Sequence, residues 1–265
     1  MSFLGNVANL TSNKGLLYIE KTLFYTVVIF AGLMLSMAIA LVLPEFYGGV
    51  LFGVKDEAYP FSFQMIMWVP FYVGLSDLII KMYAHQKRKK LFDEDILKGS
   101  AATIYTPKNL VGVLKQVKGY DKFEEIVFLD LIHEVILKYQ TSRSVNECSS
   151  VLESLINIYE KRLDLFYTKI RYISWLIPTM GFIGTVYGIS LSVALVGKAS
   201  PDDPTLLPSI AASLAIAFDT TLLALVQASV LLFISNIIEN LEFTLISDSN
   251  KYIYKKLINR LEPNG

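Results

Sequence analysis

Four long apolar runs dominate the chain, at residues 23–43, 61–80, 172–196 and 209–238. As a helix, the first run would extend about 31 Å, which is enough to cross a hydrocarbon core of about 30 Å. It is too long for the core of a signal peptide, so we expect an uncleaved membrane anchor. The second run is weaker because Gln64, Pro70 and Asp77 interrupt it, but a helix bundle accommodates such residues. The pattern predicts four transmembrane helices.

Lysine and arginine residues gather on one side of these runs. The second run leads into KMYAHQKRKK, and further basic residues precede the first and third runs, whereas the loops on the other side carry mainly acidic residues. Basic residues mark the cytoplasmic side, so we expect both termini and the central segment there. The predicted parts are a cytoplasmic N-terminal segment at 1–22, a first transmembrane pair with a short periplasmic loop at 23–80, a cytoplasmic helical domain at 81–171, a second transmembrane pair at 172–238 and a cytoplasmic C-terminal helix at 239–265.

The polar segments carry helical periodicity. The stretch DKFEEIVFLDLIHEVILKY, residues 121–139, is amphipathic, and its leading carboxylates would complement the dipole of a helix. From Ser144 to Tyr172, apolar residues recur every three or four positions, and no proline or glycine separates them from the third run. The segment after the fourth run continues in the same way. We therefore expect an all-α membrane protein in which two long helices extend from the membrane into the cytoplasm.

The composition agrees with a membrane protein and excludes several other classes. The chain is 53% hydrophobic and 18% charged, whereas soluble domains have about 25% charged residues, and its mean hydropathy is +0.47. Its formal net charge is zero, so nucleic acid is not an expected partner. The single cysteine, Cys148, excludes an intrachain disulfide and a multi-cysteine zinc site. Since no phosphate loop, nucleophile elbow or metal-ligand motif is found, we expect no enzyme, no metal site and no cofactor.

The third run contains a cluster of small residues in IPTMGFIGTVYGI, residues 177–189, which has Pro178 as its second residue. On a helix, one face carries Gly181, Gly184, Thr185, Gly188 and Ser192. Such a face allows two membrane helices to approach closely. Alternatively, it lines a narrow path in which Thr185 offers its oxygen to a passing cation or water. Geometry alone leaves both interpretations open.

The fourth run contains Asp219, which lies about ten residues from its start. A charged aspartate near the bilayer centre costs at least about 2.5–3.5 kcal/mol, so Asp219 is expected to face protein or water, or to be protonated. We favour a functional role over a structural hydrogen bond. Asp219 and Thr221 lie about 200° apart on a helix, so they cannot both point to one axis. Ser213, Thr220 and Gln227 form another polar seam, suited to helix packing or subunit contacts.

Together, PTMGFIGTVYGI and IAASLAIAFDTTLLALVQA resemble the two pore motifs of the MotA/TolQ/ExbB proton-channel family. The first motif of that family is matched by Pro178, Gly181, Gly184, Thr185 and Gly188, and the second by Ala217, Thr221 and Leu225. The resemblance therefore places Thr185 and Thr221 at the two threonines that line the pore in the TolQ and ExbB branches. The paired motifs are fairly specific, while either one alone would be weak.

The chain also departs from the family pattern. Ala224 stands where glycine is usual, and Ile216 stands where the energiser branch often has a glutamate. Asp219 lies three residues after Ile216, on nearly the same helix face; our hypothesis is that it takes over the role of that acid. Four predicted spans are typical of the MotA branch, while the threonine pair is typical of TolQ and ExbB, so the branch stays undetermined.

The resemblance implies a channel subunit of the bacterial inner membrane. It implies a homopentameric ring around a dimer of a MotB/TolR/ExbD-like protein, whose single membrane helix bears an aspartate. H+ or Na+ would load that aspartate beside the two threonines, and the ion-motive force would drive rotation. A rival interpretation is a non-conducting membrane scaffold that uses the glycine face for oligomerisation. A secondary transporter is a weaker rival, because four spans without an inverted repeat do not fit one.

Overall fold

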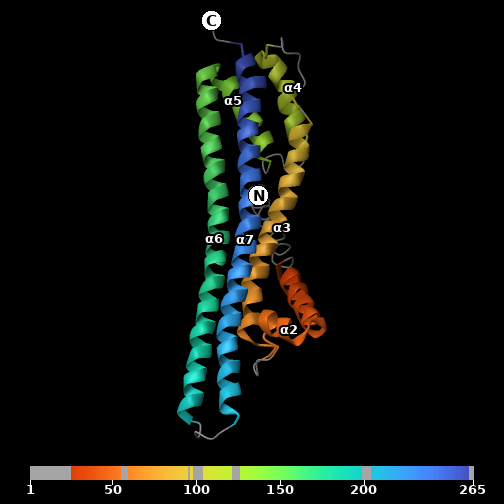
Figure 1. Ribbon diagram of the computed structural model, residues 1–265. Coiled ribbons are helices and arrows are strands. Elements are labelled where there is room, and N and C mark those ends of the chain that lie inside the picture. Colours follow the sequence, from red (N-terminus) through yellow and green to blue (C-terminus); the bar gives the residue numbers. More distant parts are fainter. Residues whose placement is uncertain are drawn as a thin grey trace, which may run out of the picture. The chain divides into compact units, whose positions relative to one another are not determined.

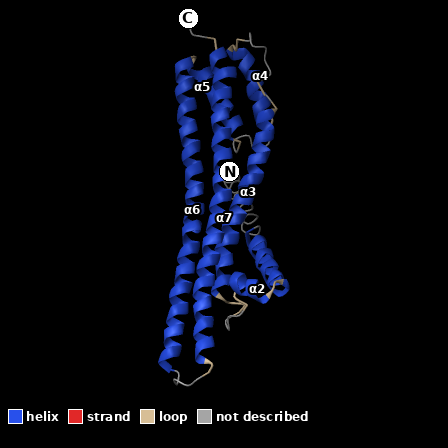
Figure 2. Ribbon diagram, viewed as in Figure 1, coloured by secondary structure: helices blue, strands red, loops and turns tan. Residues whose placement is uncertain are grey.

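The computed structural model describes residues 25–54, 59–94, 96–97, 104–120, 126–198 and 204–262. The predicted N-terminal segment at residues 1–22 lies outside this part of the chain. Within the described residues, every regular element is a helix (Figures 1 and 2). An isolated bridge joins Tyr105 to Leu261. The expected all-helical architecture is confirmed.

The chain divides into two compact units, which share three long helices. Unit 1 contains the described residues up to Ile79 and those from Ile170 to Ile234, and unit 2 contains those from Ile80 to Lys169 and from Ser235 onward. The shared helices are α3 (Phe63–Asp93), α6 (Val145–Lys198) and α7 (Leu206–Lys256).

Four helices of the described chain are long and apolar enough to cross a membrane. The first of them is Tyr25–Val42, and the other three are α3, α6 and α7. Each overlaps one of the four predicted apolar runs over most or all of its length, so the predicted number of candidate spans is confirmed. The continuous α6 also confirms that the periodic segment after Ser144 joins the third run without a break.

Inside unit 1, hydrogen bonds join the first helix, Tyr25–Val42, to α3. The hydroxyl of Tyr25 donates a hydrogen bond to the carboxylate of Asp77, which is buried. Farther along, the hydroxyl oxygens of Ser36 and Tyr72 lie 2.6 Å apart. These polar contacts explain how the weaker second run tolerates an aspartate, because the carboxylate is paired inside the protein rather than facing lipid.

The predicted periplasmic loop contains a short helix, α2 (Glu45–Phe52). Pro44 precedes it, Glu45 provides a carboxylate in its first turn, and Gly53 ends it in the left-handed conformation with φ 66°. A prolyl φ and an acidic first turn favour a helix start, and glycine favours this kind of stop. The helix is only 8 residues long, too short for its apolar composition to reveal a period.

Unit 1 presents apolar side chains outward from α6 and α7. The large exposed residues on these two helices include Phe182, Ile183, Val186, Val193, Phe218, Leu222 and Phe233. In water such a surface would be unfavourable, whereas lipid or neighbouring membrane helices can cover it. The polar residues of the two motifs lie instead toward the contact between α6 and α7.

Unit 2 contains α4 (Pro107–Lys118), α5 (Val127–Ser142) and the parts of α3, α6 and α7 that belong to it. A 3-10 turn, Ile258–Arg260, follows α7. Leu129, Ile132 and Ile136 of α5 are fully buried. The described part of α5 starts at Val127, later than the predicted amphipathic segment, whose leading carboxylates fall on residues 121–125 outside the described residues. The first turn of α5 holds Asp130 instead.

A buried carboxylate joins two of the long helices in unit 2. Glu242 of α7 has a side chain only 3% exposed and accepts hydrogen bonds from Lys81 Nζ at 3.1 Å and Arg88 Nη1 at 2.8 Å. Both basic residues belong to the run that the sequence analysis used only for membrane orientation. They therefore also have a packing role.

Candidate functional site

The glycine face of α6 is covered by α7 of the same chain. A Cβ built on Gly184 would lie 2.6 Å from Thr220 Oγ1, and one on Gly188 would lie 2.7 Å from the carbonyl oxygen of Ser213. At Gly181 the added atom would meet the Cβ of Ala224 at 2.5 Å. All three distances are too short for a side chain, so glycine permits the close approach of α6 to α7.

This close approach brings the two motif threonines together. The hydroxyls of Thr185 and Thr221 are hydrogen-bonded to each other. Thr185 Oγ1 also lies 3.2 Å from the carbonyl oxygen of Gly181 on its own helix and 3.0 Å from that of Ala217 on α7. Thr221 Oγ1 lies 3.2 Å from the Ala217 oxygen and 3.5 Å from the Gly181 oxygen. We call these four oxygen atoms the threonine cluster.

The threonine cluster contains more acceptor oxygens than donor hydrogens. Each hydroxyl has one hydrogen and two lone pairs, and each carbonyl has lone pairs only. When one threonine donates to the other and the second donates to a carbonyl, lone pairs of the two hydroxyl oxygens remain unused, whereas the carbonyls also accept from their own helices and lie within reach of Thr220 Oγ1. Thr185 and Thr221 are half-buried, so this acceptor-rich group lies at the edge of the α6–α7 contact. Such oxygens can coordinate a hard cation or accept hydrogen bonds from water.

The second polar seam lies inside the α6–α7 contact. Ser213, Thr220 and Gln227 are all buried within the single chain. Thr220 Oγ1 lies 3.4 Å from the Gly181 carbonyl oxygen, and Ser192 Oγ on α6 lies 3.4 Å from the Ile210 carbonyl oxygen. These side chains therefore pack helix against helix in one subunit, which leaves them no surface for the subunit contacts considered above. Pro178 lies within α6.

Asp219 lies on the other edge of the contact from the threonine cluster. Thr220 is fully buried against Gly184, and successive residues of a helix are separated by about 100°. Thr221 and Asp219 therefore flank Thr220 on opposite sides, and both are half-buried. The carboxylate is displaced from the threonine cluster, in agreement with the angular separation that the sequence predicts.

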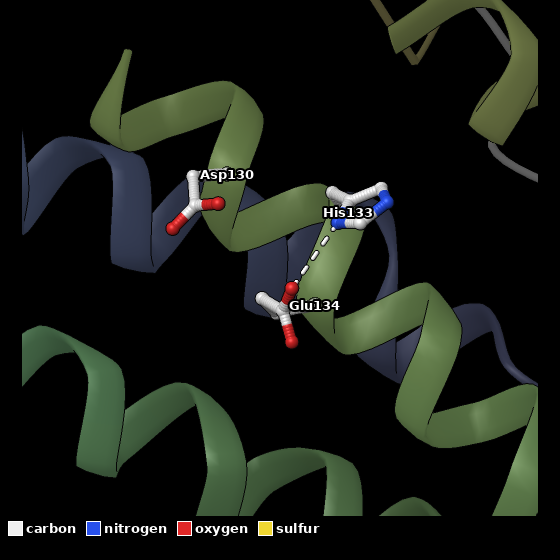
Figure 3. A group of neighbouring side chains, drawn as sticks. All are labelled: Asp130, His133 and Glu134. Atoms are coloured by element: carbon white, nitrogen blue, oxygen red, sulfur yellow. Dashed lines mark hydrogen bonds and ion pairs between the residues drawn. The ribbon is translucent and has the colours of Figure 1, made fainter. Parts of the chain in front are cut away.

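A different cluster, on α5 of unit 2, has the composition of a metal site. Asp130, His133 and Glu134 share one face of the helix, and their potential ligand atoms lie within 4.8 Å of one another (Figure 3). Asp130 accepts a hydrogen bond from the Tyr159 hydroxyl, and His133 Nδ1 lies 3.2 Å from Glu134 Oε1. These contacts within the protein account for the cluster, which the sequence analysis did not single out.

The sequence analysis did not predict two of the four oxygen atoms of the threonine cluster. They are the carbonyl oxygens of Gly181 and Ala217, which lie four residues before Thr185 and Thr221. A threonine in a helix often bonds to the carbonyl four residues earlier, so the signal was present. What the sequence could not show is that each carbonyl also lies within reach of the opposite threonine.

Comparison with known protein families identifies the segment that carries both motifs. Residues 121–250 match the MotA/TolQ/ExbB proton channel family. This segment includes both motifs, and the resemblance inferred from them is confirmed. No curated protein and no solved structure matches the chain.

The fold and the match together define the class of protein. The described residues are all-helical with four candidate membrane spans, and the matching family consists of membrane-embedded ion channel subunits of energiser complexes, which are not enzymes. More particularly, residues 121–250 form a domain of the MotA/TolQ/ExbB proton channel family. Members of this family typically work with a partner of the MotB/TolR/ExbD type.

Proposed function

We propose that the chain forms the ion-conducting ring of an ion-driven rotary motor in the bacterial inner membrane. Five copies surround a dimer of a single-span, MotB/TolR/ExbD-like protein that carries a membrane aspartate. H+ or Na+ loads this aspartate beside Thr185 and Thr221 and leaves toward the cytoplasm, so that the partner turns relative to the ring. Unit 2 and both termini lie in the cytoplasm in this proposal.

The observation that carries the proposal is the threonine cluster. Two hydroxyls and two carbonyls from separate helices converge at the edge of the α6–α7 contact, and an oxygen-rich group in an otherwise apolar unit suits a partly dehydrated cation. The glycines at 181, 184 and 188 serve this path indirectly, because they bring α6 close enough to α7 for the hydroxyls to meet.

The scaffold alternative required the glycine face to bind a second copy. That face is covered by α7 of the same chain, with less than 3 Å between the added Cβ atoms and α7, and so it is not a free surface for oligomerisation. The large exposed apolar residues of α6 and α7 are a better candidate for contacts between copies.

Two measurements on the complex purified from its native membrane test the proposal. Native mass spectrometry should give five copies of this chain with two of a single-span protein that has an aspartate in its membrane helix. Reconstituted complex should carry H+ or Na+ down an imposed gradient, and separate gradients of each ion identify the one transported. A chain that purifies without such a partner, or a complex that conducts neither ion, would favour the scaffold.

A further inference from the structure

Unit 2 contains a cavity of about 340 Å³ with a basic lining. Its wall is formed by α3, the start of α5, α6 and α7. The polar and charged residues that line it are Lys81, Arg88, Tyr159, Arg162, Glu242 and Ser249. We call it the basic cavity. Its volume is at the lower end of the range of sites for small molecules, about 300–1,000 Å³.

The positive charge of the basic cavity exceeds its negative charge. Lys81, Arg88 and Arg162 stand against one carboxylate, Glu242. Because Glu242 is bonded to both Lys81 and Arg88, its single negative charge compensates only one of them. Asp130, which is bonded to the Tyr159 hydroxyl, brings a second negative charge behind the wall. Glu134 also lies near Tyr159, so the excess of positive charge belongs to the residues that line the cavity themselves.

Hydrogen-bond donors also remain for a ligand. Arginine has five N–H donors and lysine three, and the contacts with Glu242 use one nitrogen of Arg88 and the ammonium of Lys81. Their side chains are 28% and 20% exposed, so a solute can reach them. Arg162 forms no ion pair with a described residue; its guanidinium lies 5.6 Å from the ring of Tyr159. Its planar fork is therefore available, and such a fork matches phosphate oxygens well.

The start of α5 adds an independent contribution of the same sign. Ile126, Val127 and Phe128 line the basic cavity, and α5 begins at Val127 with no side-chain cap from Ile126. The first N–H groups of a helix lack partners within that helix, and its N-terminus carries a partial positive charge. This end favours an anion at the cavity wall, where three basic side chains already stand.

We propose that unit 2 binds a phosphate-bearing anion in the basic cavity, held by Lys81, Arg88 and Arg162. The phosphate is either that of an anionic phospholipid headgroup or that of a soluble phosphate ester, since both present the same oxygens. The headgroup is a natural source because Lys81 directly follows the predicted second span. This binding is separate from ion conduction at the threonine cluster and does not depend on it.

Binding can be measured with the full-length protein in a neutral detergent, freed of its lipid. The probes are dihexanoyl phosphatidylglycerol, dihexanoyl phosphatidylcholine and inorganic phosphate, followed by broadening of their phosphorus NMR lines. We expect saturable binding of phosphatidylglycerol, inorganic phosphate or both. Phosphatidylglycerol alone identifies a lipid headgroup, and inorganic phosphate identifies a soluble ligand. Arg162→Gln should weaken this binding by about tenfold, as expected for the loss of one charge-assisted contact.

The matched control is Lys161→Gln, which removes the same charge from the neighbouring exposed position outside the basic cavity. It should leave the affinity within about twofold, since an exposed charge is screened. A second variant, Arg88→Lys, keeps a positive charge for Glu242 but loses the guanidinium fork, so it should fold and bind more weakly. The proposal is overturned if neither phosphatidylglycerol nor inorganic phosphate binds saturably. It is also overturned if Arg162→Gln and Lys161→Gln reduce the affinity equally.

Discussion

Thr185 and Thr221 form a reciprocal pair: their hydroxyls are bonded to each other, and each also reaches the carbonyl oxygen four residues before the other threonine. Such reciprocity requires the two helices to approach closely at these positions. The glycines of α6 provide that approach. The two sequence motifs are thus halves of one structural unit, and a change in the glycine face should alter the geometry of the threonine cluster.

Gly184→Ala tests this dependence. The added methyl would lie 2.6 Å from Thr220 Oγ1, so α6 and α7 must separate or Thr220 must shift, at a cost of about 1–3 kcal/mol for overpacking. We expect a lower melting temperature in detergent by tryptophan fluorescence. Gly197→Ala is the control, because nothing lies within 4 Å of its added Cβ.

A second substitution sharpens that result. Thr220→Ala removes Oγ1 and Cγ2, two of the three atoms that an alanine at position 184 would meet, and keeps Cβ. The double variant should therefore recover part of the stability that Gly184→Ala loses. If the stability losses of the two single variants simply add in the double variant, the side chains at positions 184 and 220 do not clash.

The four membrane helices were predictable from the sequence because hydropathy is a local property. The close approach of another helix to α6 could also be predicted, since glycines at positions 181, 184 and 188 share one face of any helix. The sequence does not predict which helix covers that face. The sequence allowed α7 of the same chain, another subunit or an ion path, and only the positions of Thr220 and Ser213 across from these glycines decide in favour of α7.

Glu242→Gln should destabilise unit 2. The amide keeps the shape of the side chain but removes the charge that binds Lys81 and Arg88. Because the two partners are partly exposed, solvent offsets some of the loss, and we expect about 1–3 kcal/mol. Chemical unfolding of the full chain measures it.

Asp248→Asn is the matched control for this substitution, since it also removes a carboxylate from α7 but from an exposed position. Its effect should stay within about 0.5 kcal/mol. Equal losses in the two variants would show that the buried ion pairs do not hold α3 to α7.

Sequence reasoning missed this ion pair for a physical reason. Lys81 and Arg88 belong to a basic run, and such runs mark membrane orientation. Their partner Glu242 lies more than 150 residues later, so only the packing of α3 and α7 reveals the pairing.

Asp219→Asn tests the proposed role of the membrane acid. If Asp219 replaces the glutamate that is absent at position 216, the amide should lower ion-driven transport several-fold while pentamer and partner still assemble. Assembly is followed by native mass spectrometry and transport in proteoliposomes. Full transport with normal assembly in Asp219→Asn would contradict this role.

The most direct test of the channel assignment is ion transport by complexes that carry Thr185→Val or Thr221→Val, reconstituted in proteoliposomes under an imposed gradient. Valine keeps the branched shape but removes the hydroxyl. We therefore predict that the transport rate falls at least about tenfold, the effect expected for the loss of one charge-assisted hydrogen bond. Thr185→Ser, which keeps the hydroxyl, should retain most transport. Thr179→Val, which loses a hydroxyl bonded to the Trp175 carbonyl of its own helix, should conduct normally. Normal transport in both Thr185→Val and Thr221→Val would contradict a path beside the threonine cluster.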